Sequence, residues 1–330
     1  MHALISCERL TAQSCATGLR VRARLSAAAL AVMAPFGLGA VGGREAWKRH
    51  APMPQARSEV AVAAAAGEIV VAGGYVVRGE NTARVDAYSI GAERWRRLPD
   101  LPVAVDHAAA ASAHGRVYVV GGYGRDRVPR RTVFALTGGA WQRLPDLPDG
   151  RAAAAAAIAG GRLYVVGGRN GHRSLARDAF AMKLGSGRWI RIHGPAPREH
   201  LAAAASGGRV YAIGGRTAGI DTNTTTFEVY DVMARRWRGL APLPGARGGT
   251  GAAAAGARIL SAGGEEPAGT IASVYAYDRA ARRWARLPDL PTPRHGLGVV
   301  AAGGRVWVVA GGPVPGLTVS GALESLKMTT

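Results

Sequence analysis

From residue 57 onward, short apolar stretches alternate with short polar turns. Residues 60–64 are small and apolar, and a turn at Ala66 and Gly67 leads into a second apolar stretch at 69–72. A polar loop follows, then two more stretches at 85–88 and 95–98. Stretches of four or five residues bounded by turn residues are typical of β-strands. Residues 57–102 therefore predict a unit of four short antiparallel strands.

The same unit recurs along the chain, marked by two independent features. Pairs of glycines lie 46 to 49 residues apart, beginning at Gly73, Gly121, Gly167, Gly214, Gly263 and Gly311. Tryptophans lie 46 to 48 residues apart, at Trp47, Trp95, Trp141, Trp189, Trp237 and Trp284. A four-stranded unit repeated with a period near fifty indicates a β-propeller.

The fold class predicted is all-β, a closed six-bladed propeller. Alanine runs at 108–111, 152–157, 202–205 and 252–255 suit thin inner strands near a crowded axis, and they are too short and too flanked by glycine for helices. The tryptophans are expected to fill the widening wedge between blades. Residues 322–326 match a third strand with no fourth strand after it. We therefore expect the segment around Trp47 to complete the last blade and close the ring.

Residues 1–44 form a separate segment. Arg20, Arg22 and Arg24 precede an apolar run at 25–41 that ends in small residues, the pattern of an export signal cleaved near Ala40. A retained membrane anchor is the alternative. We expect residues 45–330 to be the propeller, secreted or periplasmic in a bacterium. Cys7 and Cys15 precede the repeats, which excludes a disulfide or cysteine ligand in the propeller.

The net charge of +20 does not by itself indicate a nucleic-acid partner. Of the 42 basic residues 39 are arginine, a bias typical of a GC-rich genome, and no nucleic-acid-binding motif is present. We expect no specific nucleic-acid partner.

Arginine recurs sixteen residues before the first glycine of the pairs, at Arg57, Arg151, Arg198 and Arg247, with Val105 in the second repeat. Arg294 joins this series if Ala310 is an insertion. Antiparallel pairing puts these residues at the same end as the residues after the pairs, which include Tyr75, Tyr123, Arg169, Arg216, Glu265 and Pro313.

One interpretation is a cationic channel mouth, with these arginines and with Tyr75, Tyr123, Arg169 and Arg216 binding an anionic ligand. The other interpretation is that the repeated arginines anchor the connection between blades through backbone carbonyls.

Two residues after the arginine position stand Glu59, His107 and His200, candidates for acid–base chemistry near the axis if the strand alternates regularly. The other interpretation, which the ordinary number of histidines favours, is that they are solvated rim residues. No histidine pair has metal-ligand spacing, and no phosphate-binding or dinucleotide motif is present. We therefore expect no metal and no cofactor.

The phrase from Val117 to Gly122, followed by Trp141 and then Leu144-Pro145, is similar to the Kelch repeat, and the resemblance covers residues 46–328. Kelch propellers serve as oxidases, epimerases, sugar binders and protein adaptors, so the resemblance implies the fold more than the activity. Galactose oxidases need a crosslinked cysteine that this domain lacks.

Exported sialic-acid mutarotases (N-acetylneuraminate epimerases) are also six-bladed Kelch propellers. That resemblance implies a carboxylated sugar held by Arg198, with Glu59, Glu199 or His200 moving a proton. The sequence leads us to expect an exported binding module for an acidic glycan or peptide. The alternative is a carbohydrate-active enzyme of the mutarotase or epimerase type.

Overall fold

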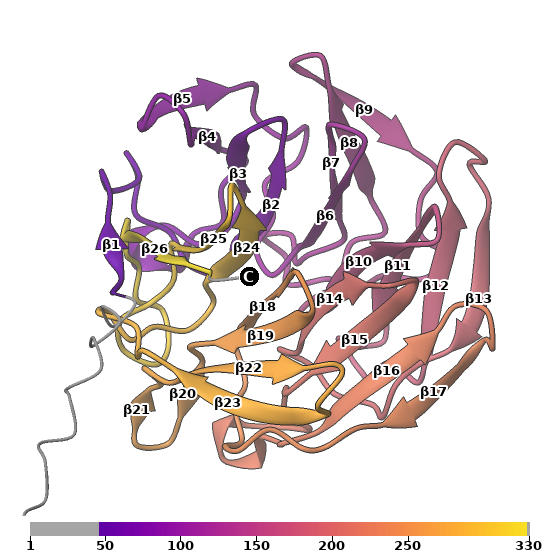
Figure 1. Cartoon of the computed structure of the whole chain (residues 1–330). Coiled ribbons are helices and arrows are strands. Elements are labelled where there is room, and N and C mark those ends of the chain that lie inside the picture. Colours follow the sequence, from indigo (N-terminus) through magenta and orange to yellow (C-terminus); the bar gives the residue numbers. More distant parts are fainter. Residues whose placement is uncertain (1–45, 329–330) are drawn as a thin grey trace, which may run out of the picture. The chain divides into compact units, whose positions relative to one another are not determined.

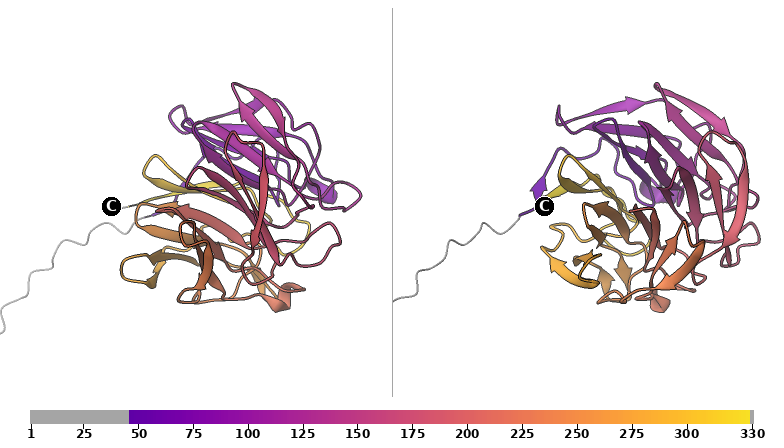
Figure 2. Two further views of the ribbon diagram at one scale, coloured as in Figure 1. Left: turned by 90° about the vertical axis from the view of Figure 1, so that its right-hand side faces the viewer. Right: turned by 45° about the vertical axis from the view of Figure 1, so that its right-hand side comes forward.

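The computed structural model of the chain describes residues 46–328, which form six four-stranded antiparallel sheets arranged around a central axis (Figure 1). The predicted closed six-bladed propeller is confirmed. Figure 2 shows the ring of sheets from two further directions. The predicted export signal lies outside the described residues.

Each blade runs outward from the axis in chain order, and only the last blade borrows a strand from the start of the chain. Blade 1 contains β2 (Ala61–Ala65), β3 (Glu68–Ala72), β4 (Val85–Ser89) and β5 (Arg94–Leu98); blade 2 contains β6 (Ala109–Ala113), β7 (Arg116–Val120), β8 (Val133–Thr137) and β9 (Ala140–Leu144); blade 3 contains β10 (Ala155–Ala159), β11 (Arg162–Val166), β12 (Asp178–Lys183) and β13 (Trp189–His193). Blade 4 contains β14 (Ala202–Ser206), β15 (Arg209–Ile213), β16 (Phe227–Asp231) and β17 (Arg236–Gly239); blade 5 contains β18 (Gly251–Ala255), β19 (Arg258–Ala262), β22 (Val274–Asp278) and β23 (Arg283–Leu287); blade 6 contains β24 (Gly298–Ala302), β25 (Arg305–Val309), β26 (Leu323–Lys327) and β1 (Lys48–Arg49).

Neighbouring blades share apolar cores. Alanines of β2 and Val70 of β3 pack against Val117 and Val119 of the next blade, and the ring of Trp141 packs against that core. The Trp141 indole also donates a hydrogen bond of 2.8 Å to the carbonyl of Pro99 in blade 1. The expected wedge position is confirmed, although each of these tryptophans is only partly buried.

The predicted closure of the ring is confirmed. Strand β1 pairs with β26, with Lys48 opposite Ser325. The indole of Trp47 donates to Pro288 of blade 5, as the other outer-strand tryptophans do to the blade before them. His50 contacts the hydroxyls of Ser325 at 2.7 Å and Tyr88 at 3.2 Å, so it bridges blades 6 and 1.

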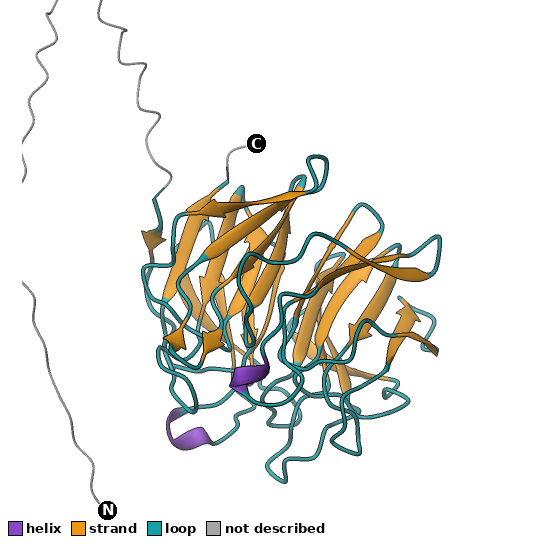
Figure 3. Cartoon of the chain, turned by 90° about the horizontal axis from the view of Figure 1, so that it is seen from below, coloured by secondary structure: helices purple, strands orange, loops and turns teal. Residues whose placement is uncertain are grey.

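The longer loops, which join the second and third strands of the blades, gather at one end of the propeller. They include the 3₁₀ helices η1 (Val77–Gly79) and η2 (Ile220–Thr222), shown in purple on the same side in Figure 3, and the hairpin of β20 (Glu265–Glu266) and β21 (Gly269–Thr270). We call this end the loop face. Within residues 46–328, neither helix is long or apolar enough to cross a membrane.

The last repeat contains no insertion at Ala310, which corrects the alignment made from the sequence. The Arg294 side chain donates to the carbonyl of Ala310, sixteen residues on, as Arg57 does to Gly73 and Arg198 to Gly214. Ala310 has a φ of +60°, so it occupies the position of the first glycine. Gly312 then pairs with His295, and Gly312 rather than Pro313 is the residue after the pair.

Candidate functional site

Two rings of backbone hydrogen bonds join the blades at the loop end of the central channel. In the outer ring, the amide of the second glycine position donates to the carbonyl of residue 57, 105, 151, 198, 247 or 294 in the next blade, at 2.7 to 3.0 Å. In the inner ring, each amide donates to the preceding blade's carbonyl at 2.8 to 3.0 Å. The inner ring, which we call the channel ring, consists of Glu59, His107, Ala153, His200, Gly249 and Gly296.

All six residues of the channel ring adopt left-handed backbone conformations, with φ between +49° and +62°. Glycine adopts this conformation freely, but other residues are disfavoured in it by about 1–2 kcal/mol each. Three of the six nevertheless carry large polar side chains, namely Glu59, His107 and His200. Backbone strain of this kind concentrates at functional sites, so these three side chains are the first candidates for function.

The repeated arginines do not line the channel mouth, which corrects the first interpretation of this series. Their side chains lie inside their own blades and are at most 1% exposed; they are Arg57, Arg151, Arg198, Arg247 and Arg294. Arg198, for example, binds Glu228 at 2.5 Å and the carbonyls of Gly214 and Ala212. Burial lowers the pKa of Arg57 to about 10, although the negative charge of Asp86 acts to raise it. Arg57 is therefore cationic at neutral pH. These five arginines fit the alternative interpretation, an anchor within and between blades.

The left-handed conformation at Glu59 explains why the arginines were wrongly predicted to line the channel. Regular alternation would point residues 57 and 59 the same way, but the left-handed conformation at Glu59 interrupts the extended backbone. Arg57 therefore packs into the blade while Glu59 lines the channel.

Glu59, His107 and His200 come together at the channel, although they lie in three different blades. The Nε2 atoms of the two histidines are 3.0 Å apart, and Nε2 of His107 lies 3.3 Å from a Glu59 carboxylate oxygen. The cavity that they line, together with the alanine-rich inner strands, has a volume of about 150 Å³. A drug-sized ligand needs about 300–1,000 Å³, so this part of the channel suits an ion, water or a small group.

Electrostatics in this cluster favours an ionised carboxylate. Burial would raise the pKa of Glu59, but the surrounding His107, His295 and His200 hold it well below its usual range. Burial also opposes charge on both histidines; Glu59 and Asp106 outweigh it and raise the pKa of His107, whereas burial prevails and lowers the pKa of His200.

Two of the predicted ligand-binding tyrosines lie directly above His107, and each packs edge-on against its imidazole. Tyr75 and Tyr123 are largely buried, and the guanidinium of Arg127 lies over both rings and hydrogen-bonds to the Tyr75 hydroxyl. Arg127 also pairs with Asp106 at 2.9 Å. These aromatic faces are therefore already occupied by a protein cation.

Arg169 and Arg216 lie on the opposite side of the channel end, where carboxylates neutralise both. Arg169 pairs with Glu199, and Arg216 binds Glu265 at 2.7 Å and His200 at 3.0 Å. His200, 3.6 Å from Glu199, and Arg169 lower the pKa of Glu199 to about 2, although burial alone would raise it. The channel end is thus a balanced network of charges rather than the cationic mouth expected from sequence.

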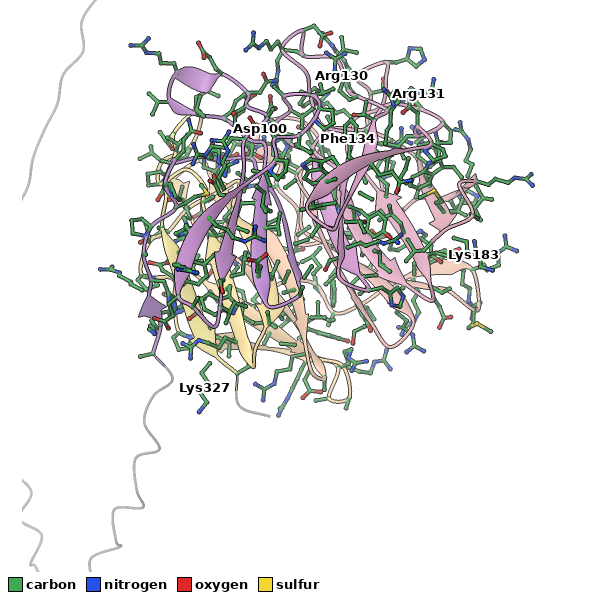
Figure 4. All side chains as sticks on the ribbon, turned by 90° about the horizontal axis from the view of Figure 1, so that it is seen from above. Asp100, Arg130, Arg131, Phe134, Lys183 and Lys327 are labelled. Atoms are coloured by element: carbon green, nitrogen blue, oxygen red, sulfur yellow. The ribbon has the colours of Figure 1, made fainter. Side chains whose placement is uncertain are left out.

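An excess of positive charge does exist farther out, on the loops of blades 1–3. The loops at 75–84, 123–132 and 169–177 hold nine arginines, of which four are in ion pairs, namely Arg84, Arg127, Arg130 and Arg169. The other five face one remaining loop carboxylate, Glu80, whereas the loops at 216–226, 265–273 and 313–322 hold one arginine and three carboxylates. Figure 4 shows Arg130 and Arg131 of this region at the end of the propeller opposite Lys327. We call the loops of blades 1–3 the basic half of the loop face.

The sequence prediction missed Asp106, which contacts two of the predicted site's residues, His107 at 2.6 Å and Arg127 of the basic loop at 2.9 Å. Asp106 occupies the same position in its blade as Glu199 and His295, one residue after the arginine series. This shared position, one residue after the arginine series, was the sequence feature that could have identified Asp106. Metal-ligand spacing within a single segment could not have found a cluster drawn from three blades.

A closed six-bladed β-propeller with a polar channel ring thus defines the class of protein. Residues 106–312 match the KLHDC2/KLHL20/DRC7 Kelch-repeats domain, and residues 56–102 match the Kelch motif. Because the first match spans more than half of the sequence, the chain belongs to the Kelch-repeat family, as the sequence resemblance implied.

The comparison with solved structures agrees on the fold. The structure described as "Structure of YjhT" superposes with a TM-score of 0.72 at 15% sequence identity, over 83% of this chain and 95% of that one. At this identity the likeness concerns the fold alone. The comparison with curated proteins found no match.

Proposed function

We propose that this Kelch propeller is a binding module that recognises an anionic ligand, an acidic peptide or an acidic glycan, on the basic half of its loop face. The observation that carries the proposal is the uneven charge of the loops, since five arginines of blades 1–3 are in none of the ion pairs among the described residues and face one loop carboxylate, Glu80. Guanidinium groups match carboxylates and sulfates with paired hydrogen bonds. The proposed ligand contacts are therefore made by exposed arginines of the loops and not by the buried arginine series.

Exposed arginines and apolar side chains alternate on these loops. Arg78, Arg125 and Arg173 are exposed, and so are Val77 and Val128 beside them. On the adjoining blade 6 loop, Val314 and Leu317 are also exposed. A surface of this composition suits an extended acidic segment that also carries apolar groups.

The proposal is tested by measuring binding of a labelled oligoglutamate peptide and a sulfated oligosaccharide by fluorescence anisotropy at several salt concentrations. The double variant Arg78→Glu/Arg125→Glu should weaken binding at least about tenfold, since two contacts change sign. The matched control, Arg236→Glu/Arg238→Glu, makes the same change in charge on exposed strand β17. Equal losses in both variants would mean that only net charge matters, and duplex DNA would then bind as well.

The second candidate is a carbohydrate-active enzyme, favoured by the convergence of Glu59, His107 and His200. The cavity at this cluster is too small for a sugar, so the ring would have to lie above it, beside Tyr75 and Arg169. Catalysed anomer exchange of a carboxylated sugar, measured by NMR and lost in Glu59→Gln, would establish this activity. Exchange at the uncatalysed rate would exclude it.

Export is part of the proposal and rests on the basic and apolar pattern of residues 20–41. Expression of the full chain in a bacterium should yield a periplasmic product whose first residue, read by mass spectrometry, follows Ala40 closely. An intact chain in the cytoplasm would contradict export.

A further inference from the structure

The contacts of His107 and His200 leave an unusual arrangement at the centre of the channel ring. Nδ1 of His107 lies 2.6 Å from an Asp106 carboxylate oxygen, so this nitrogen carries the proton. Nε2 of His200 lies 3.0 Å from Arg216, which can only donate, so this nitrogen carries a lone pair. The Nε2 atoms of His107 and His200 nevertheless face each other at 3.0 Å, with the Glu59 carboxylate beside them. A proton on His107 or a cation must lie among these three acceptors.

We propose that Glu59, His107 and His200 bind a divalent transition metal ion, with Zn²⁺ as the best-matched ion. Their donor atoms all lie within 4.8 Å of one another. Zinc bonds of 2.0–2.1 Å in a tetrahedron place neighbouring ligand atoms about 3.3 Å apart. The two measured donor separations, 3.0 Å and 3.3 Å, are close to this value. Two imidazoles and one carboxylate leave a fourth position open for water or a small ligand.

The surroundings contain the supporting contacts that such sites require. Asp106, which is buried, orients His107 in the way that a carboxylate commonly orients a metal-bound histidine. Nδ1 of His200 is buried with no hydrogen-bond partner among the described residues, and Glu199 lies 3.6 Å away, in the position equivalent to Asp106. The dipeptides Asp106-His107 and Glu199-His200 therefore present a carboxylate followed by a histidine from two blades, although only Asp106 is within hydrogen-bond distance of its histidine.

His295 contacts the second carboxylate oxygen of Glu59. Its Nε2 lies 3.2 Å from the carbonyl of Val314 and therefore carries a proton. Its buried Nδ1 lies 3.3 Å from Oε1 of Glu59 and 3.6 Å from a carboxylate oxygen of Glu265. This contact leaves Oε2 of Glu59, the oxygen that faces His107, for the ion.

The charges around the cluster permit a divalent ion. Glu59, Asp106, Glu199 and Glu265 supply four negative charges against three from Arg127, Arg169 and Arg216. Arg216 is the group that opposes the metal, because it occupies Nε2 of His200. It can leave that atom without losing its partners, since Glu265 at 2.7 Å and Glu199 at 3.5 Å still hold it.

The test is a titration of the full-length, untagged and chelator-treated chain with ZnCl₂ by isothermal calorimetry, and with Co²⁺ by visible absorption. One ion per chain should bind, and Co²⁺ should give the strong absorption of a low-coordinate site. His107→Gly and His200→Gly should each weaken binding about 100-fold or more, and Asp106→Asn about tenfold. Glycine is chosen because Gly249 and Gly296 already occupy this backbone conformation, so the variants should fold.

His114→Gly is the matched control, because exposed His114 also has a left-handed backbone, with φ +51°, but lies in a turn away from the channel ring. It should bind Zn²⁺ as the unchanged protein does. Zinc binding that survives in His107→Gly and His200→Gly would assign the ion to surface histidines and overturn the proposal. No binding by the folded protein at neutral pH would show that a proton on His107 joins the cluster instead.

Discussion

At the scale of single residues, backbone conformation separates structural from functional positions. In blades 1–5 the first glycine position is left-handed, and a Cβ there would lie within 2.9 Å of a backbone oxygen of the next blade. In blade 6, Ala310 takes this position with φ +60°. The channel ring is left-handed too, yet it carries Glu59, His107 and His200. The glycine pairs are therefore explained by packing, whereas the three polar residues are not.

Alanine substitutions at Gly121 and Gly115 distinguish the cost of a left-handed backbone from the cost of crowding by the next blade. A Cβ on Gly121 would lie 2.1 Å from the carbonyl oxygen of Arg151, whereas one on Gly115 would meet nothing within 4 Å, and both residues have positive φ. Gly115→Ala should lower the free energy of unfolding by about 1 kcal/mol, and Gly121→Ala by about 3 kcal/mol or more. Urea denaturation measures both. Equal losses would show that the conformation, and not the neighbouring blade, requires glycine at 121.

The buried arginine series makes a second prediction at this scale. Arg198→Ala should lower the free energy of unfolding by about 3–5 kcal/mol, because it leaves Glu228 and three carbonyls without their partner. Arg198→Lys should recover only part of this loss, since an ammonium cannot reach all four acceptors. Thermal and urea unfolding measure the loss, with exposed Arg238→Ala as the control. A stable Arg198→Ala variant that fails to bind the anionic ligand would contradict the anchoring role.

At the scale of elements, the blade boundary is sealed by an aromatic ring and a hydrogen bond together. Trp141 stacks over the shared core of blades 1 and 2 while its indole reaches the Pro99 carbonyl. Every outer-strand tryptophan makes the same bond to the blade before it. The 46- to 48-residue spacing of the tryptophans in the sequence is therefore the spacing of inter-blade contacts.

Trp141→Ala should cost about 2–3 kcal/mol of unfolding free energy, less than for a fully buried tryptophan because part of the ring is exposed. Trp141→Phe keeps most of the packing and should cost about 1 kcal/mol for the lost hydrogen bond. Arg143→Ala, on the same strand in an exposed ion pair, serves as the control and should change little. Ligand and zinc binding should stay unchanged, and a loss of either would mean that the wedge also shapes the loop face.

Prediction from the sequence succeeded where one local rule repeats. The strand positions, the six blades and the closing segment at Trp47 all followed from short apolar stretches and two markers. The site was harder to predict, because side-chain direction depends on a left-handed residue that alternation cannot reveal. Glu59, His107 and His200 were named from their register, but their mutual contact depends on ring closure. Asp106 was missed because its partner Arg127 comes from another segment.

At the scale of the whole molecule, stability and the central site both depend on a closed ring. The channel ring passes its backbone hydrogen bonds from blade to blade and returns through Glu59 to Gly296. Closure at the periphery comes from β1 and Trp47, which complete blade 6. An opening at the periphery would leave β26 as an exposed edge and loosen the circle that brings Glu59 of blade 1 toward His295 of blade 6.

A chain that begins at Ala51 should therefore lose at least about 3 kcal/mol of unfolding free energy, because it lacks β1, Trp47 and the His50 bridge. It should also associate through its free β26 edge, as light scattering would detect. A circular permutant that carries residues 45–50 after Met328 through a short turn restores the usual order of strands three and four. It should regain stability and stay monomeric. If the truncated chain were as stable as the permutant, the N-terminal strand would be dispensable, and the inner rings alone would hold the propeller closed.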